Sequence, residues 1–353
     1  MAKLDELLSS LKTNDASDLH LAAGLEPRMR THGELVIIEG QPVLTDTTLR
    51  ELMSELPIPR VWKQYQETND ADFAYSLEGV ARFRANYFVQ ENGAGAVFRI
   101  IPEEIVPLEK LNVPEAIANL ATLNGGLVLV TGPTGSGKST TLAAIVDKMN
   151  RERSLHIVTI EDPVEFVHQN KKSVFSHREV GLHTNGFAPA LRAAIREDAD
   201  VVLVGEMRDY ETISLALAAA EMGVLVFGTL HTNNAAKTID RVIDAFPADE
   251  QLQARISLSE SLYAVVSQLL LPTADGKGRC AVNEILLKTS ALPNLIREGN
   301  IPMIPSLIQS GKGIGMQAMD DALFALVEEG RITADDAFRK AGEKARFEPL
   351  LAS

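Results

Sequence analysis

The chain has 353 residues, 45% of them apolar, and a formal net charge of −14. This length is typical of two domains, and the apolar content is enough for sizeable cores. A strongly acidic chain is not a natural nucleic-acid binder, so no nucleic-acid partner is expected. The single cysteine, Cys280, excludes an internal disulfide and a four-cysteine zinc site.

The first ten residues already carry Lys3, Asp5 and Glu6, so we expect no signal peptide. No apolar run reaches the length that spans a bilayer. We therefore expect a cytoplasmic protein without direct membrane insertion, which associates with a membrane only through partners.

Residues 1–101 predict a small α+β domain on an antiparallel sheet. Leucines recur at helical spacing over residues 4–11, and residues 46–67 also have helical character with an interruption at two prolines. Turn residues, including an Asn-Gly pair, separate shorter stretches that are typical of strands. These strand candidates cover residues 17–21, 35–38, 72–77, 81–90 and 94–101.

Proline-spaced polar residues over 102–114 predict a linker, and a second domain is expected over 115–353. Apolar strands alternate there with helices, which predicts a mostly parallel sheet covered on both faces. The strands are expected at 127–130, 157–160, 201–204 and 224–230, and the helices at 140–150, 187–197 and 210–222. Later helices are expected over 249–270, 290–298, 303–310, 316–329 and 333–341, so that the chain is helical from about residue 290.

A glycine-rich loop follows the strand at 127–130 and leads into a helix, which is the full pattern of a phosphate-binding loop. Its glycines allow consecutive N–H groups to point inward, and the helix N-terminus adds positive potential. Lys138 is expected on the β- and γ-phosphates, and the Ser139 hydroxyl on Mg²⁺. The candidate binding residues are Gly132, Pro133, Thr134, Gly135, Ser136, Gly137, Lys138, Ser139 and Thr140.

Carboxylates follow the strand expected at 157–160, where Glu161, Asp162 and Glu165 come in close succession. Ligands of parallel sheets bind outside the carboxyl ends of the strands. We therefore expect this group to hold Mg²⁺, directly or through water, or to orient a nucleophile. The alternative is a solvated acidic turn.

Polar residues also follow the next two strands. Gly205 and Glu206 stand where many phosphate-loop NTPases have an Asp that holds Mg²⁺. Glu206 is placed to take a proton from the attacking water, while Gly205 weakens the case for direct metal coordination by this strand. His231 is expected to sense the γ-phosphate or to position water. The alternative for Gly205 and Glu206 is an exposed polar turn. The alternative for His231 is a purely structural histidine.

Arginines of the first domain form the last candidate group. Arg82 and Arg84 flank Phe83 and therefore face the same side of a strand, and Arg99 ends the next strand. Arginines presented together suit the triphosphate of a neighbouring subunit. An ordinary solvated strand face is the alternative.

These segments resemble the four signature boxes of the secretion ATPases, the hexameric motors of type II secretion and type IV pili. The boxes correspond to residues 132–140, 160–166, 204–209 and 228–241. Residues 17–21, 81–84 and 98–102 resemble the N-terminal domain of the pilus retraction ATPases. Residues 294–298 resemble their C-terminal signature, with substitutions at its start.

The resemblance implies an α/β fold, with a RecA-like P-loop ATPase domain, a small PAS-like N-terminal domain and a helical C-terminal extension. It implies ATP and Mg²⁺ as cofactors and a homohexamer at the pilus base, peripheral to the inner membrane. The implied partners are an inner-membrane pilus platform protein and a paralogous pilus ATPase. By position, the implied catalytic residues are Glu206, with Glu161 and Glu165 supporting metal or water, His231 linking nucleotide state to the subunit interface, and Arg82, Arg84 and Arg99 acting in trans.

The expected function is therefore a motor that powers pilus retraction and twitching motility. Assembly and type II secretion ATPases usually carry an extra N-terminal domain and a four-cysteine zinc module, which this sequence lacks. Three alternatives stay open: an accessory paralogue of the retraction motor, a nucleotide-binding regulator that does not hydrolyse, and a phosphotransferase. A DNA-pumping motor is disfavoured by the acidic composition.

Overall fold

The computed structural model describes residues 3–31, 33–101 and 104–351. It divides into two compact units, one of residues 1–104 with 162–167 and the other of residues 105–161 with 168–353. Each unit has its own sheet. The two units are described one at a time below.

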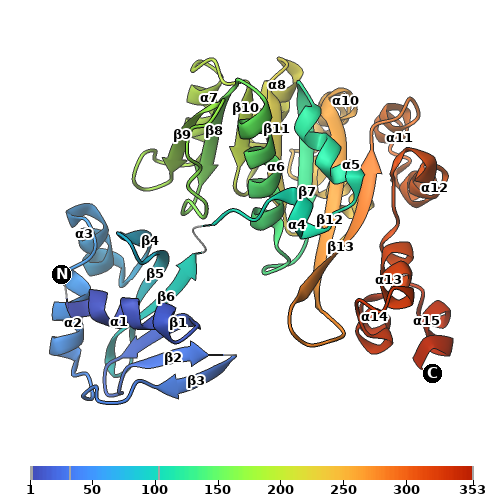
Figure 1. The fold of residues 1–353 in the computed structure, drawn as a ribbon. Helices are drawn as coiled ribbons and strands as arrows, with labels where there is room; N and C mark the ends of the chain where they lie inside the picture. Colours follow the sequence, from blue (N-terminus) through green and yellow to red (C-terminus); the bar gives the residue numbers. More distant parts are fainter. Residues whose placement is uncertain (1–2, 32, 102–103, 352–353) are drawn as a thin grey trace. The chain divides into compact units, whose positions relative to one another are not determined.

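The first unit is a six-stranded antiparallel sheet with the order β3-β2-β1-β6-β5-β4. Buried and exposed side chains alternate along most of β4 and β5, so that their apolar side chains lie on one face of the sheet. Helices α1, α2 and α3 pack on this sheet (Figure 1). The strands are β1 Ala16–Ala22, β2 Arg28–Thr31, β3 Glu34–Ile37, β4 Asp70–Leu77, β5 Ala81–Gln90 and β6 Gly93–Ile101, and the helices are α1 Lys3–Thr13, α2 Asp46–Ser54 and α3 Pro59–Thr68.

Local signals account for the boundaries of α2 and α3. Thr45 caps α2 by accepting a hydrogen bond from the backbone N–H of Thr48, and Pro59 opens α3 in the first helical turn. Asn69 ends α3 in the left-handed region. β2 was not among the predicted strands because its four residues, with two arginines, show no apolar alternation.

The second unit is a seven-stranded mixed sheet with the order β13-β12-β7-β11-β10-β8-β9, in which only β13 is antiparallel to its neighbour. The strands are β7 Gly126–Thr131, β8 His156–Glu161, β9 Val174–Glu179, β10 Val201–Val204, β11 Leu225–Leu230, β12 Leu262–Pro272 and β13 Arg279–Leu287. The helices are α4 Leu108–Leu111, α5 Glu115–Ala118, α6 Lys138–Glu152, α7 Phe187–Ala194, α8 Tyr210–Glu221, α9 Ala235–Asp244, α10 Gln251–Ser261, α11 Leu292–Arg297, α12 Ile304–Ser310, α13 Met319–Glu328, α14 Ala334–Lys340 and α15 Lys344–Leu351.

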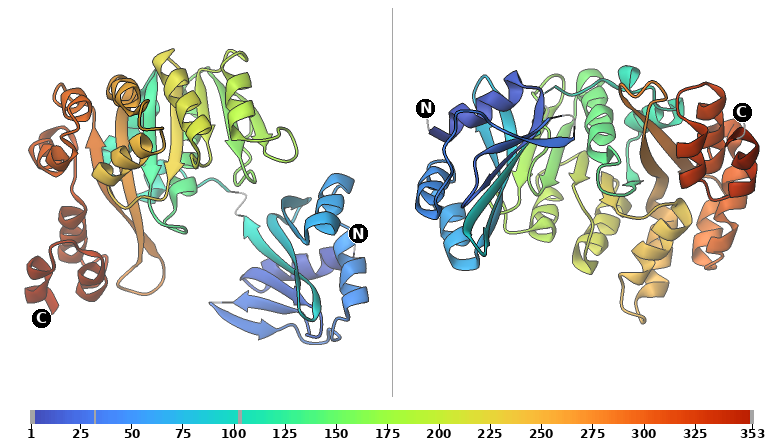
Figure 2. Two further views of the ribbon diagram at one scale, coloured as in Figure 1. Left: turned by 180° about the vertical axis from the view of Figure 1, so that it is seen from behind. Right: turned by 90° about the horizontal axis from the view of Figure 1, so that it is seen from below.

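Helices cover both faces of this sheet. Along β7, Leu127 and Leu129 pack into a core with α7 to α12, whereas Val128 and Val130 pack against α4, α5 and α6 on the opposite face. The two helical layers can be compared in Figure 1 and in the view from behind in Figure 2. A third core joins the second half of β12 and the first half of β13 to α13, α14 and α15.

The structure differs from the predicted secondary structure in several places. The helix expected over 249–270 is wrong beyond residue 261, because the chain leaves α10 and continues as β12. β9 and β13 were also missed. Continuous apolar runs such as that of β12 fit a buried strand and a buried helix equally well.

The stretch 102–114 was predicted as a linker, and part of it is helical. Pro102 and Glu103 lie outside the described residues. α4 lies within the stretch, and Leu108 is only 3% exposed in the core beneath α6. Residues 105–114 therefore belong to the second unit.

Candidate active site

The loop between β7 and α6 has the backbone geometry of a phosphate-binding loop. Gly132, Gly135 and Gly137 have φ values of 144°, 79° and 82°, which residues with a Cβ rarely adopt. α6 begins at Lys138, so its unpaired N-terminal N–H groups face the loop. The Lys138 ammonium donates hydrogen bonds to the carbonyls of Gly132 (2.9 Å) and Pro133 (3.1 Å).

This loop, the end of β11 and the end of β10 are consecutive along one edge of the sheet, because β7 neighbours β11 and β11 neighbours β10 in parallel register. We call this the carboxyl edge and define it by residues 132–139, Glu161, Glu206 and His231. Thr140 continues the first turn of α6 beside Ser139, and both are half-buried.

Two side chains bind the carboxylate of Glu206 at the carboxyl edge. Its side chain is 19% exposed, and its Oε1 lies 3.1 Å from His231 Nε2. Arg208 binds the same carboxylate through two nitrogens, with Nε 2.5 Å from Oε1 and Nη2 2.6 Å from Oε2. The model thus brings together two residues that are 25 positions apart in the sequence.

The surroundings of Glu206 keep it ionised. Burial by itself raises the pKa of this carboxyl, but the hydrogen bond and charge of Arg208 and then the contact with His231 outweigh it. The net pKa lies below its ordinary value, so Glu206 is a carboxylate at neutral pH.

Gly205 allows β8 and β10 to approach each other at their ends. The Gly205 N–H donates to the Ile160 carbonyl (2.8 Å), and a Cβ at Gly205 would lie 3.3 Å from the Glu161 Cα and 3.4 Å from its Cγ. An Asp at this position would press against Glu161. The glycine therefore has a steric reason to replace the Asp found in many phosphate-loop NTPases.

Thr229 fixes the loop that carries Glu206, and motif reasoning had not singled it out. Its hydroxyl donates to the Gly205 carbonyl (2.5 Å), and its own carbonyl accepts from the Met207 N–H (3.0 Å). These two bonds hold the backbone on both sides of Glu206 against β11.

Asp162 and Glu165 are grouped with a different unit of the chain than Glu161. They belong to residues 162–167, which group with the first unit, whereas Glu161 ends β8 in the second unit. Their expected joint role in holding metal or water stays a prediction.

The three candidate arginines share one face of the six-stranded sheet, opposite the helices, and we call this group of Arg82, Arg84 and Arg99 the arginine face. Arg84 and Arg99 are directly opposed across β5 and β6. Arg84 binds Asp72 (2.5 Å) and Arg99 binds Asp18 (2.7 Å).

Both of these ion pairs lie within the first unit. Arg82 donates to the Ser76 hydroxyl (3.2 Å) on the neighbouring strand. Arg84 and Arg99 are nonetheless exposed, so their guanidinium groups are available on the surface of the unit. Their action in trans stays a prediction.

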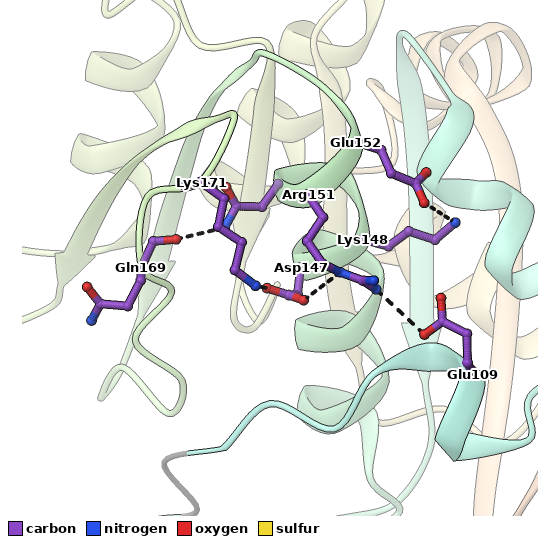
Figure 3. Close-up of polar contacts among 8 residues, drawn as sticks. Glu109, Asp147, Lys148, Arg151, Glu152, Gln169 and Lys171 are labelled. Carbon is purple, nitrogen blue, oxygen red and sulfur yellow. Dashed lines mark hydrogen bonds and ion pairs between the residues drawn. The ribbon is translucent and has the colours of Figure 1, made fainter.

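The far end of α6 is anchored by a buried carboxylate, shown in Figure 3. Asp147 is 8% exposed and accepts from Lys171 (2.5 Å) and Arg151 (3.1 Å), which reach it from opposite sides. Arg151 also forms an ion pair with Glu109, in which Nη2 lies 3.6 Å from Oε2. The network ties α6 to α4 and to the segment before β9, so it fixes the helix that carries Lys138.

Gln268 was missed entirely, although it contacts the phosphate-binding loop. It is 1% exposed on β12 and forms hydrogen bonds with Ser136 and Thr141. The erroneous helix over 249–270 concealed it. The available signal was the polar pair Ser267-Gln268 within an otherwise largely apolar run.

Comparison with known proteins identifies the family. Residues 2–299 match the model of the family described as type II/IV secretion system protein. The type IV pilus retractation ATPase PilT of Pseudomonas aeruginosa is 50% identical over 338 residues, which cover 96% of this chain and 98% of that protein.

The chain belongs to the type II/IV secretion system protein family, and within it to the group of pilus retraction ATPases. A second relative, the type IV pilus ATPase PilU of the same organism, is 40% identical over 339 residues, which cover 96% of this chain and 88% of that protein. A crystal structure of the pilus retraction motor PilT with bound ADP superposes with a TM-score of 0.91 at 42% identity, covering 99% of this chain and 100% of that one. The resemblance noted in the sequence is thereby confirmed.

The family comparison also bears on the fold. The α/β architecture, with helices packed on one antiparallel and one mixed sheet, is similar to that of the PilT structure. Among the helices that the structure describes, none combines the length and the apolar character that crossing a bilayer requires.

Proposed function

We propose that this protein is a Mg²⁺-dependent ATPase that powers type IV pilus retraction and twitching motility. The observation that carries the proposal is the convergence of a phosphate-binding loop, Glu206 and His231 on consecutive strand ends, in a chain 50% identical to PilT over almost its full length. In this proposal residues 115–353 form a RecA-like ATPase domain and residues 1–101 a PAS-like domain.

The proposed catalytic step uses groups that are already in place. The loop N–H groups and Lys138 bind the phosphates, and the ionised Glu206 accepts a hydrogen bond from water and orients it for in-line attack on the γ-phosphate. His231 Nε2, which lies 3.1 Å from Glu206 Oε1, holds this carboxylate in position. Because His231 directly follows β11, this contact connects Glu206 to the end of that strand.

The residues present fit Mg²⁺ that arrives with the nucleotide. Among the described residues, no group of three or more His, Cys, Asp and Glu side chains could hold a metal ion by itself. The Ser139 hydroxyl on the first turn of α6 would complete the coordination supplied by the phosphates, with Glu161 in support. When bound, Mg²⁺ neutralises the charge that develops on the transferred phosphoryl group.

We further propose a homohexameric ring with heterologous contacts. The arginine face would supply Arg82, Arg84 or Arg99 to the nucleotide of a neighbouring subunit, where guanidinium groups stabilise the developing charge. The ring would act at the cytoplasmic side of the pilus base, on an inner-membrane platform protein. A paralogous pilus ATPase is a candidate second partner.

The test is a gene deletion in the parent organism, complemented with wild type or with Glu206→Gln. A retraction motor predicts hyperpiliated cells that do not twitch, which wild type restores and the variant does not. Purified Glu206→Gln should bind ATP but hydrolyse it at least about 100-fold more slowly. Bald cells would instead indicate an assembly motor, and unchanged twitching an accessory paralogue.

A further inference from the structure

β12 lies beside the strand that leads into the phosphate-binding loop. The two strands pair in parallel, and their register ends where Ser267 lies opposite Thr131. The hydroxyls of these two residues are 2.9 Å apart. One residue further along, β7 has become the loop, and the residue that β12 places beside it is Gln268.

The buried amide of Gln268 uses both of its polar atoms at the loop. Its Nε2 donates to the Ser136 carbonyl at 2.6 Å, and its Oε1 accepts from the Thr141 hydroxyl at 2.9 Å. One amide thus binds the loop and the first turn of α6 together. Because it is 1% exposed, water cannot replace either bond.

The loop also packs tightly against Gln268. A Cβ at Gly132 would lie 2.2 Å from the Gln268 carbonyl oxygen, and a Cβ at Gly137 would lie 3.0 Å from its Nε2. Two glycines of the motif therefore face this one residue. Because these two glycines have no side chains, β12 can lie close to the loop, and phosphate can bind close to its backbone.

The hydrogen bond to Ser136 fixes the direction of a neighbouring N–H group. In a planar trans peptide, the carbonyl of Ser136 and the N–H of Gly137 point in opposite directions. With the carbonyl held toward Gln268, the Gly137 N–H is held away from β12. That is the orientation an anion-binding loop needs from consecutive N–H groups.

We propose that Gln268 is a positioning residue for nucleotide binding, which keeps the Gly137 N–H directed at the phosphates and joins the loop to α6 through Thr141. The inference rests on the proposed function in one respect, that the ligand is a nucleotide. It assigns to β12 a role in the site for which no sequence motif accounts.

The test compares Gln268→Met, which keeps the volume but loses both hydrogen bonds, with Thr141→Val, which loses only the bond from the helix. The matched control is Ser267→Ala, a neighbouring buried residue of the same strand that pairs with Thr131. Each full-length variant is titrated with fluorescent ADP, and ATP turnover is measured over a range of ATP concentrations.

Gln268→Met should bind ADP about tenfold more weakly and raise KM for ATP by a similar factor, with kcat within about threefold of wild type. Thr141→Val should weaken binding by less, and Ser267→Ala should bind as wild type does. Equal ADP affinity in wild type and Gln268→Met would overturn the inference. A wild type that binds no nucleotide would instead overturn the proposed function.

Should Gln268→Met fail to fold, Gln268→Glu gives an independent readout. A protonated carboxyl still donates to the Ser136 carbonyl, whereas the carboxylate cannot. ADP affinity of this variant should therefore fall as pH rises, more steeply than that of wild type. Parallel pH profiles for the two proteins would contradict the role of Gln268 as a donor.

Discussion

The carboxyl edge and the arginine face concentrate polar side chains in different ways. At the carboxyl edge, groups from separate strands converge at one end of a parallel array, and Glu206 meets His231 and Arg208. On the arginine face, polar side chains spread across antiparallel strands, and Arg84 and Arg99 each bind an acid of the same unit. The first arrangement assembles a candidate site within one chain, whereas the second is a surface that we propose for contact with a neighbouring subunit.

The strongest test of the carboxyl edge is Lys138→Ala. It removes the cation that the loop holds against the Gly132 carbonyl, so ATP turnover should fall by about 100-fold or more. Steady-state phosphate release measures this. The matched control is Lys148→Ala on the same helix, whose ammonium binds Glu152 instead, and it should keep wild-type turnover.

The anchoring of the carboxyl edge is tested by Asp147→Asn. Two cations converge on this buried carboxylate, and its neutralisation should lower the free energy of unfolding by about 2 kcal/mol. Denaturant unfolding measures the loss. Glu211→Gln, which breaks an exposed pair with Arg192, should cost less than about 0.5 kcal/mol. Equal losses in the two variants would show that Asp147 is no anchor.

The arginine face is tested by Arg84→Gln compared with Asp72→Asn. If Arg84 serves a neighbouring subunit, its removal should lower turnover by about tenfold, the value of one charge-assisted hydrogen bond. Asp72→Asn removes the partner but keeps the guanidinium, so turnover should stay near wild type. A similar loss in both variants would mean that the ion pair matters only for the structure of the first unit.

The smallest predicted effect concerns pH. Burial lowers the pKa of His20 below 6.5; Asp18 opposes this, while Arg30 and Arg99 add to it. Below about pH 6.5 the unfolded chain therefore takes up a proton that the folded unit resists, and stability falls as pH falls. His20→Gln should lose less stability than wild type between pH 7.5 and 5.5.

Trp62, the only tryptophan, lies on α3 and reports unfolding of the first unit by its fluorescence. Identical losses of stability in wild type and His20→Gln over this pH range would contradict the prediction.

The carboxyl edge was predictable because its signals are local. The loop, Glu206 and His231 each follow a short apolar strand, and adjacent strands in a parallel sheet end at the same edge. The contact between Glu206 and His231 was not predicted, because it also depends on β10 and β11 being neighbours in the sheet. The arginines could likewise be placed on one face, since strand residues alternate.

What could not be predicted depends on contacts between distant residues. Gln268 reaches Ser136 across 132 positions, and Lys171 reaches Asp147 from a segment with no regular period. The acid partners of the arginines also required the register of β1 with β6 and of β4 with β5. Periodicity reports which side chains are buried but not which residue lies opposite.

The pairing of β12 with β7 contains a bulge near the start of β12, and this bulge determines which residue lies beside the phosphate-binding loop. Leu262 lies opposite Leu127 and Ala264 opposite Val128, so Tyr263 is an extra residue in the pairing with β7. Every later partner of β7 depends on this insertion. If Tyr263 instead paired with Val128 while Leu262 kept its partner, Val266 would lie opposite Thr131, and Ser267, which has no amide, would lie beside the loop. One residue at the start of the strand thus acts as a spacer that determines the chemistry offered to the phosphate-binding loop about 15 Å away, at about 3.3 Å per residue.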